Sequence, residues 1–368
     1  MPGGLTHPAR LDAARAILDR GDLDALLVSR TANKRWLSGF VLLPGEEPTA
    51  RWSGTLLVTR DRAIVLADAR YTEQAGGQCP GWEVRLAQGE MHVEVPSLAR
   101  QIGVRRIGAE ASVLSHAQWA ALEAAGLELV PEDSGLDDLR IRKDADELGA
   151  IERACALTDR CFAHLLETVR PGMTEREVAW QIETFFRASG ADGAAFTPLV
   201  LVGARAAMPH GHASDVPVRP DAPLLLDFGC QVDGYRSDMT RTIFFGEPDA
   251  EARRRYEAVR EAQQRAFEAA AVGVTGRDVD AAARDCLAEG GRGEAFTHGL
   301  GHGIGLETHE SPMLKSWDRP LQAGMVFTLE PGVYLPGEIG IRIEDTVVLE
   351  AAGPRRLTHS PRELLLSA

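Results

Sequence analysis

The chain has 368 residues, which is too long for one ordinary hydrophobic core, so two domains are expected. Its apolar content of 44% and charged content of 26% are typical of a soluble globular protein, and its net charge of −14 argues against a nucleic acid partner, because phosphate binding needs a basic surface. The sequence shows neither a signal peptide nor the apolar run of roughly 20 residues that spans a membrane. Its five scattered cysteines argue against a disulfide framework, so we expect a cytoplasmic protein.

The first third of the chain mixes helical and strand patterns. Helices are predicted at residues 8–19, from residue 70, at 92–102 and at 115–125. Strands are predicted at residues 24–29, 54–59, 63–67, 106–110 and 127–130, with the second and third joined as a hairpin. This pattern predicts an α/β amino-terminal domain with a mixed sheet over residues 1–135.

Residues 33–52 lack a regular pattern and carry Trp36, Phe40 and Trp52. Two interpretations stay open. The segment reaches over a site in another domain or subunit, or it is a loop held in place by its own aromatic side chains.

The polar, turn-forming residues 131–138 mark the expected boundary, so residues 136–368 form the second domain. Helices are predicted at residues 143–169, 174–189, 250–271 and 275–289, and Thr174 with Glu177 has the spacing of a capping box. Strands are predicted at residues 196–202, 224–232, 235–245, 325–334 and 339–349. Paired helices separated by antiparallel hairpins indicate an α+β domain with helices covering one face of a curved sheet.

The first chemical signal is a hairpin whose turn is Asp233 and Gly234. Counting from this turn places Asp227 opposite Thr240, so that Asp227 and Asp238 are diagonal neighbours on one face, roughly 7 Å apart or less. Carboxylates this close repel each other unless a cation lies between them, and Gly229 opposite Asp238 would leave room for one. The alternative is an exposed pair of aspartates, but Asp227 follows three leucines in a core strand, where a lone charge is costly.

A second hairpin repeats the arrangement with Glu330 and Glu344. A two-residue connection would place them on opposite faces, whereas a three-residue connection at residues 336–338 would place them directly across from each other. Arg342 lies two residues before Glu344, shares its face, and is expected to orient a carboxylate bidentately.

The third signal is the stretch FTHGLGHGIGLETHE at residues 296–310, which excludes a helix because glycine fills every second position from Gly299 to Gly305. We expect an extended strand or loop in which alternation places four side chains on one side: His298, Leu300, His302 and Ile304. A glycine-rich surface loop with incidental histidines is the alternative.

Two aspartates, two glutamates and one histidine form a donor set dominated by hard oxygen atoms. That set suits two divalent ions such as Mn²⁺ or Co²⁺, with Zn²⁺ as a further candidate. Two ions ~3.5–4 Å apart can hold a bridging hydroxide as the nucleophile of a hydrolysis.

Together these motifs resemble the pita-bread (creatinase/aminopeptidase) metallopeptidase family. The resemblance rests on LDFG, GYRSDMTRT, THGLGHGIGLETHE, LEPGVY and GIRIEDTVV, which appear in the family's order. MPHGHASD at residues 208–215, together with GTLLVT and ARYTEQA in the first half, resembles the branch of prolidase (Xaa-Pro dipeptidase) and aminopeptidase P. The resemblance implies a pita-bread catalytic domain after a creatinase-like amino-terminal domain.

It also implies roles for particular residues. The implied metal ligands are Asp227, Asp238, His302, Glu330 and Glu344. Glu330 would also carry the proton, His309 would bind the scissile carbonyl or the oxyanion, and His210 would position the residue beyond the scissile bond. His298 and Arg342 complete the expected catalytic set. The family further implies a homodimer.

The function expected from the resemblance is hydrolysis of the Xaa-Pro bond at the amino end of short proline-containing peptides. The motifs do not separate a dipeptidase from an aminopeptidase for longer peptides; that depends on what blocks the far side of the site, with residues 33–52 and Arg342 as candidates. The alternatives are a methionine aminopeptidase, a creatinase-like hydrolase of another small substrate, and a non-catalytic pita-bread binding module. Retention of all five ligand positions argues against the last two.

Overall fold

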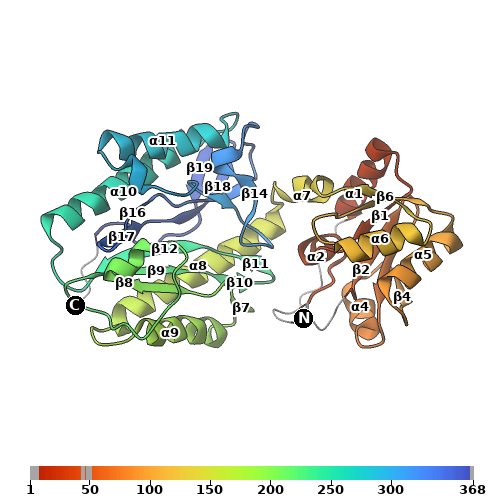
Figure 1. The fold of residues 1–368 in the computed structure, drawn as a ribbon, viewed down its shortest axis with the longest axis horizontal. Helices are drawn as coiled ribbons and strands as arrows, with labels where there is room; N and C mark the ends of the chain where they lie inside the picture. The colour runs from red at the N-terminus through yellow and green to blue at the C-terminus, as the bar shows by residue number, and fades with distance from the viewer. Residues whose placement is uncertain (1–7, 43–45, 47–51, 365–368) are drawn as a thin grey trace. The chain divides into compact units, whose positions relative to one another are not determined.

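A computed structural model describes residues 8–42, 46 and 52–364 of the chain (Figure 1). The chain divides into two compact units, Met1–Arg140 and Ile141–Ala368. Within the described ranges, no helix is both long and apolar enough to cross a membrane.

The described part of the first unit is built on a six-stranded sheet in the order β4-β3-β2-β1-β5-β6. Its strands are β1 Ala25–Val28, β2 Thr55–Thr59, β3 Ala63–Ala67, β4 Glu83–Leu86, β5 Arg106–Ala109 and β6 Glu128–Pro131. Its helices are α1 Pro8–Gly21, α2 Thr31–Ser38, α4 Thr72–Gln78, α5 Met91–Ile102, α6 His116–Ala124 and α7 Ser134–Arg140. Strand β1 pairs antiparallel with β2 and parallel with β5, which confirms the predicted mixed sheet.

Two predictions for this unit are wrong. Residues 33–38 are not irregular but lie in α2, where the polar Asn33 and Lys34 are buried because Glu110 Oε1 and the Ser53 carbonyl accept their hydrogen bonds. Residues 131–138 are predicted to form turns, but residues 134–138 lie in helix α7. Trp36 and Phe40 are buried within the unit, while residues 43–45 and 47–51 of the same segment lie outside the described residues.

The second unit has two pairs of long helices, with strands between the pairs (Figure 1). They are α8 Ala145–Thr168, α9 Glu175–Ala188, α10 Ala250–Ala269 and α11 Gly276–Glu289. The predicted capping box at Thr174 and Glu177 begins α9. Helices α8 and α9 bury their apolar faces on one set of strands, around residues such as Phe162 and Leu226.

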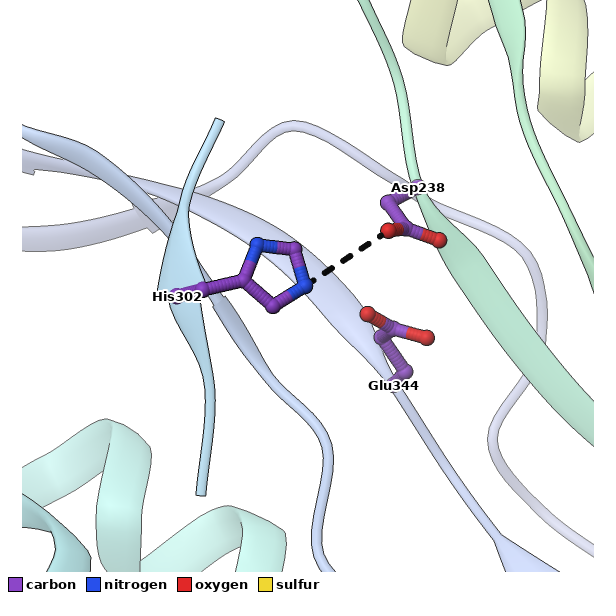
Figure 2. Close-up of side chains that lie close together, drawn as sticks. All are labelled: Asp238, His302 and Glu344. Carbon is purple, nitrogen blue, oxygen red and sulfur yellow. Dashed lines mark ion pairs between the residues drawn. The ribbon is translucent and has the colours of Figure 1, made fainter. Parts of the chain in front are cut away.

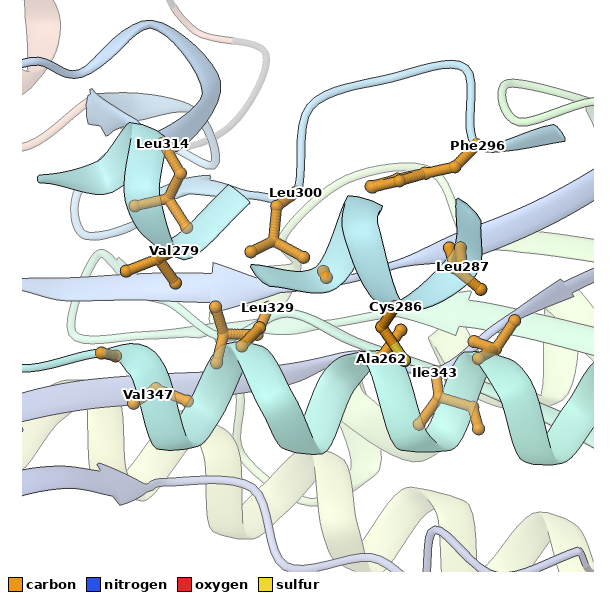
Figure 3. Close-up of a cluster of buried hydrophobic side chains, with 14 of the residues drawn as sticks. Ala262, Val279, Cys286, Leu287, Phe296, Leu300, Leu314, Leu329, Ile343 and Val347 are labelled. Atoms are coloured by element: carbon orange, nitrogen blue, oxygen red, sulfur yellow. The ribbon is translucent and has the colours of Figure 1, made fainter. Parts of the chain in front are cut away.

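Helices α10 and α11 pack on the remaining strands through a second core (Figure 3). Val279 and Leu287 of α11 and Leu329 and Val347 of the sheet all belong to this core. These two helix–strand layers confirm the predicted α+β architecture and fix the strands that carry the acidic motifs.

The strands of the second unit run antiparallel in all the pairs described. They are β7 Gly193–Ala194, β8 Leu199–Val202, β9 Pro223–Phe228, β10 Cys230–Val232, β11 Tyr235–Arg236, β12 Met239–Phe244, β13 His302–Gly303, β14 Glu310–Met313, β15 Val326–Leu329, β16 Gly332–Leu335, β17 Ile339–Arg342, β18 Asp345–Glu350 and β19 Gly353–Arg356. Among the described residues they form sheets in the orders β11-β10-β7, β12-β9-β8, β14-β13-β15-β18-β19 and β16-β17.

Candidate metal centre

The aspartate hairpin has the predicted register, with Thr240 opposite Asp227 in the pair β9–β12. The role expected for Gly229 is wrong. A Cβ atom at Gly229 would lie 1.8 Å from the carbonyl oxygen of Ser237, so backbone already fills this space. Glycine is needed here for the close approach of two backbone segments, not to leave room for an ion.

The glutamate hairpin has the three-residue connection, because Leu335 pairs with Ile339 and Gly332 pairs with Arg342. Two backbone hydrogen bonds then join the three motifs. Glu344 N donates to the Thr240 carbonyl at 3.0 Å, and Glu330 N donates to the Leu300 carbonyl at 2.8 Å. Segments that lie far apart in the sequence therefore meet at one place.

The histidine-rich stretch does not alternate as predicted. Within residues 296–310 only His302, Gly303 and Glu310 lie in strands, and the chain bends at His298 and Leu300. Leu300 is buried in the helix–sheet core (Figure 3), whereas His302 points toward carboxylates (Figure 2). A Cβ atom at Gly301 would lie 2.0 Å from the Thr328 carbonyl oxygen, so glycine lets this stretch press against β15.

His302, Asp238 and Glu344 converge in the interior of the unit (Figure 2). One ligand atom from each lies within 4.8 Å of the others. His302 Nε2 lies 3.3 Å from Glu330 Oε1 and 3.8 Å from Asp238 Oδ2. Its Nδ1 contacts the Gly303 carbonyl at 3.0 Å, which leaves Nε2 directed at the carboxylates, as in histidines that bind metals.

Asp227 completes the acidic set beside Arg342, whose guanidinium contacts Asp227 Oδ2. The prediction that Arg342 binds a carboxylate bidentately is wrong. Its Nη2 contacts Asp227, but its Nε donates to Thr240 Oγ1 and its Nη1 donates to the Tyr334 hydroxyl. Asp227 Oδ1 and Asp238 Oδ1 are buried and accept no hydrogen bond in the structure. Buried oxygen atoms without donors are costly unless a cation approaches them, so the residues present fit divalent ions.

The pKa values of the cluster also fit the binding of divalent ions. Burial raises the pKa of Asp227, Asp238 and Glu344, and the charges of neighbouring carboxylates raise each of these values further. Burial is the largest influence on Glu330 and would raise its pKa, but the hydrogen bond and charge of His302, together with neighbouring positive groups, lower this pKa to about 2. Burial would lower the pKa of His302, but the hydrogen bond and charge of Glu330, together with the charge of Asp238, raise it to about 9. The four carboxylates therefore outnumber the two cationic groups beside them, Arg342 and His302, and bound cations would supply the missing positive charge.

Tyr334 is a part of the site that sequence reasoning missed. Its hydroxyl accepts a hydrogen bond from Arg342 Nη1 at 2.8 Å and lies 2.8 Å from His298 Nε2. His298 Nδ1 contacts the Gly299 carbonyl at 2.8 Å, so both ring nitrogens are engaged, and burial lowers the pKa of this histidine. The three-residue hairpin connection places Tyr334 and Arg342 on one face, which is the signal that could have revealed the contact.

The remaining predicted residues, His309 and His210, lie at the edge of this cluster. The rings of His302 and His309 have centroids 4.1 Å apart. Partial burial and His302 lower the pKa of His309 to about 4, so this ring is neutral at pH 7. His210 is exposed and close enough to influence the pKa of both His298 and His309 electrostatically. The structure thus gathers every predicted site residue in one unit.

Comparisons with known proteins extend over almost the whole chain. Residues 149–351 match the metallopeptidase family M24, and residues 10–142 match the creatinase/prolidase N-terminal domain. An uncharacterized peptidase of Bacillus subtilis is 35% identical over 360 residues, covering 97% of this chain and 99% of the relative. The solved structure of an Xaa-Pro dipeptidase from Bacillus anthracis is similar with a TM-score of 0.91 at 36% identity, covering 97% of this chain and 99% of that chain. An X-Pro aminopeptidase from Thermotoga maritima gives a TM-score of 0.85 at 35% identity, covering 95% and 99%.

Proposed function

This chain belongs to metallopeptidase family M24, and from that premise we propose that it is a dinuclear-metal exopeptidase that hydrolyses the Xaa-Pro bond at the amino terminus of short peptides. The observation that carries the proposal is the buried carboxylate cluster, in which Asp227 Oδ1 and Asp238 Oδ1 accept no hydrogen bond. Its support is the similarity, over nearly the full chain, to one Xaa-Pro dipeptidase and one X-Pro aminopeptidase.

The family implies divalent metals, and we assign them to the same five residues: Asp227, Asp238, His302, Glu330 and Glu344. Mn²⁺ is the ion we propose, with Co²⁺ and Zn²⁺ as the alternatives, because one nitrogen and many carboxylate oxygens form the donor set. Two such ions, when bound, lower the pKa of a water molecule to near neutrality and polarise a carbonyl oxygen. Asp227 is held for this role by Arg342.

Glu330 is the residue we assign to proton transfer. Its carboxylate lies 3.3 Å from His302 Nε2 among the assigned ligands, where it can accept a proton from the attacking water. It can then pass that proton to the leaving nitrogen. This second step is needed because an amide nitrogen leaves poorly until it is protonated.

His309 and His210 are the groups we assign to the substrate. Neutral His309 lies beside His302 and can donate a hydrogen bond to the oxygen on which negative charge develops. His210 lies on an exposed segment and can contact the residue that follows the scissile bond. His298 acts differently: both its ring nitrogens are engaged, so we assign it to positioning Tyr334 and Arg342.

The test is hydrolysis of Ala-Pro and Ala-Pro-Ala by metal-stripped protein, with and without Mn²⁺. Metal-dependent cleavage of the dipeptide alone would identify a dipeptidase, and cleavage of the tripeptide with little of the dipeptide would identify an aminopeptidase. The control is Asp221→Asn, which removes an exposed aspartate paired with Arg219 and should leave the rates unchanged. No cleavage of either peptide with metal bound would contradict the proposal and favour a creatinase-like hydrolase or a binding module. Light scattering tests the homodimer, which we propose from the family.

A further inference from the structure

The segment of residues 203–215, which carries His210, has little regular secondary structure. It begins with the short helix η1 Gly203–Ala207, and residues 208–215 belong to no helix or strand. His210 itself is exposed. A segment without a strand ladder needs other contacts to keep one side chain in place, because loops of this kind are more mobile than the elements they connect.

One buried carboxylate supplies those contacts at both ends of the segment. Glu175, the first residue of α9, has a relative exposure of 0%. At the start of the segment, its Oε1 accepts hydrogen bonds from Val202 N at 2.8 Å and from Arg205 Nε at 3.0 Å. At the end, its Oε2 accepts hydrogen bonds from Ser214 N at 2.8 Å and from Ser214 Oγ at 2.6 Å.

Neighbouring contacts tie the middle of the segment to the same point. Arg205 Nη2 donates to the carbonyl oxygen of His212 at 2.6 Å, so the side chain that meets Glu175 also spans the turn around His210. The backbone N–H of Arg176 donates to the Ser214 carbonyl at 3.1 Å. Hydrogen bonds to an ionised carboxylate are stronger than those between neutral groups, which makes Glu175 the dominant anchor.

We propose that Glu175 is a positioning residue that acts on substrate through His210, by fixing residues 203–214 at both ends. This inference rests on the proposed function, because it takes His210 to contact the peptide. Glu175 has no role in holding metal or in moving the proton. Its substitution therefore alters the placement of His210 while leaving the carboxylate cluster unchanged.

The decisive variant is Glu175→Gln, which keeps the side-chain volume but turns one acceptor oxygen into a donor that faces N–H or O–H groups. We expect kcat/KM for the Xaa-Pro peptide to fall about 10- to 100-fold, the range expected when a substrate-positioning group is misplaced by about 1 Å. The matched control is Glu177→Gln in the same helical turn. Glu177 is exposed and bonds only to Thr174 in the contacts described, so its loss removes a carboxylate without touching the segment.

A double-variant cycle separates positioning from a general structural effect. If Glu175 acts through His210, adding Glu175→Gln to His210→Ala should lower kcat/KM by no more than about 2-fold beyond His210→Ala alone, because coupled residues are not additive. Independent effects that multiply would overturn the proposal. If Glu175→Gln does not fold, Ser214→Ala removes one of the four anchoring bonds and should show the same coupling with a smaller effect.

A second readout needs no activity. Trypsin should cleave after Arg205 faster in Glu175→Gln than in wild type or Glu177→Gln, with no matching increase at other sites, and mass spectrometry locates the cut. Equal cleavage after Arg205 in all three proteins would contradict the proposal. If the wild type hydrolyses no Xaa-Pro peptide, the proposed function fails, and the trypsin result alone then decides whether Glu175 anchors the segment.

Discussion

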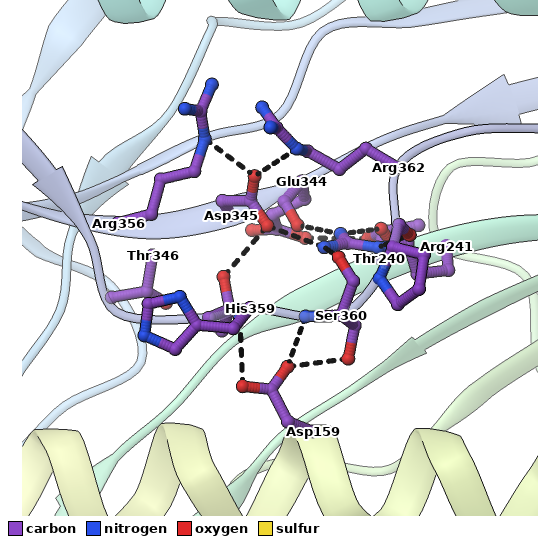
Figure 4. A network of polar contacts seen from close by, with 12 residues as sticks. Asp159, Thr240, Arg241, Glu344, Asp345, Thr346, Arg356, His359, Ser360 and Arg362 are labelled. Atoms are coloured by element: carbon purple, nitrogen blue, oxygen red, sulfur yellow. Dashed lines mark hydrogen bonds and ion pairs between the residues drawn. The ribbon is translucent and has the colours of Figure 1, made fainter.

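Glu344 and Asp345 are consecutive buried carboxylates in opposite surroundings. Asp345 accepts hydrogen bonds from Arg241 Nη2 at 2.6 Å, from Thr358 Oγ1 at 2.9 Å and from Gln263 Nε2 at 2.9 Å, and Arg356 lies close to it (Figure 4). Burial alone would raise the pKa of Asp345, but the charge and hydrogen bond of Arg241, together with Thr358 and Arg362, keep it below its usual value.

Glu344 faces the other way, into the acidic cluster. Thr240 Oγ1 donates to it at 2.6 Å, while burial and the charge of Asp238 raise its pKa. The surroundings of a buried carboxylate therefore distinguish a structural group from a candidate ligand. Both are buried, but one is surrounded by donors and positive charge, and the other shares its space with like charges and with oxygen atoms that no donor reaches.

The largest effect is expected for Asp238→Asn, which should lower activity rather than stability. Losing one proposed ligand and one acidic group from the cluster is expected to lower Mn²⁺-dependent Ala-Pro hydrolysis on the order of 10⁴-fold, or about 5.4 kcal/mol in activation free energy. The metal-free protein should keep its free energy of unfolding within about 1 kcal/mol, because the substitution relieves repulsion. A fall of less than tenfold at saturating Mn²⁺ would show that Asp238 is not a ligand.

Asp345→Asn should instead lower the stability of the protein. Removing one partner of a buried ion pair leaves Arg241 uncompensated, so the free energy of unfolding measured in urea should drop by about 3–5 kcal/mol, with or without EDTA. The control Glu350→Gln lies on the same strand with an exposed pair to Arg355, and its effect should stay within about 0.5 kcal/mol. If Asp345→Asn were as stable as the wild type, Asp345 would not be a structural carboxylate, and this distinction from Glu344 would fail.

Tyr334→Phe should give the smallest effect. It removes the hydroxyl that links Arg342 to His298 but no ligand, so kcat/KM should fall about tenfold, equivalent to about 1.4 kcal/mol and to one lost hydrogen bond. Calorimetric titration with Mn²⁺ should show little change in affinity. A loss of metal binding as large as that of Asp238→Asn would place Tyr334 in the metal centre itself.

The sequence predicts the strand registers of the candidate site better than it predicts the contacts that hold the surrounding segments in place. The turn at Asp233 and Gly234 fixes the register of one hairpin by simple counting, and the pairing of Leu335 with Ile339 decides between the two connections that counting left open. Helix α2 was missed because its buried polar residues depend on Glu110, 77 residues from Asn33. The contacts of Glu175 and the contact of Tyr334 with His298 were missed for the same reason, since they join segments whose proximity only the folded chain reveals.

The most direct test of the central claim is the number of Mn²⁺ ions that bind to each chain, measured by equilibrium dialysis of the metal-stripped protein with free Mn²⁺ counted by electron paramagnetic resonance. The buried acidic cluster predicts two ions per chain in the wild type and in Glu350→Gln, and fewer in Asp238→Asn. One ion or none in the wild type, under conditions where the peptide is hydrolysed, would contradict a dinuclear centre built from Asp227, Asp238, His302, Glu330 and Glu344.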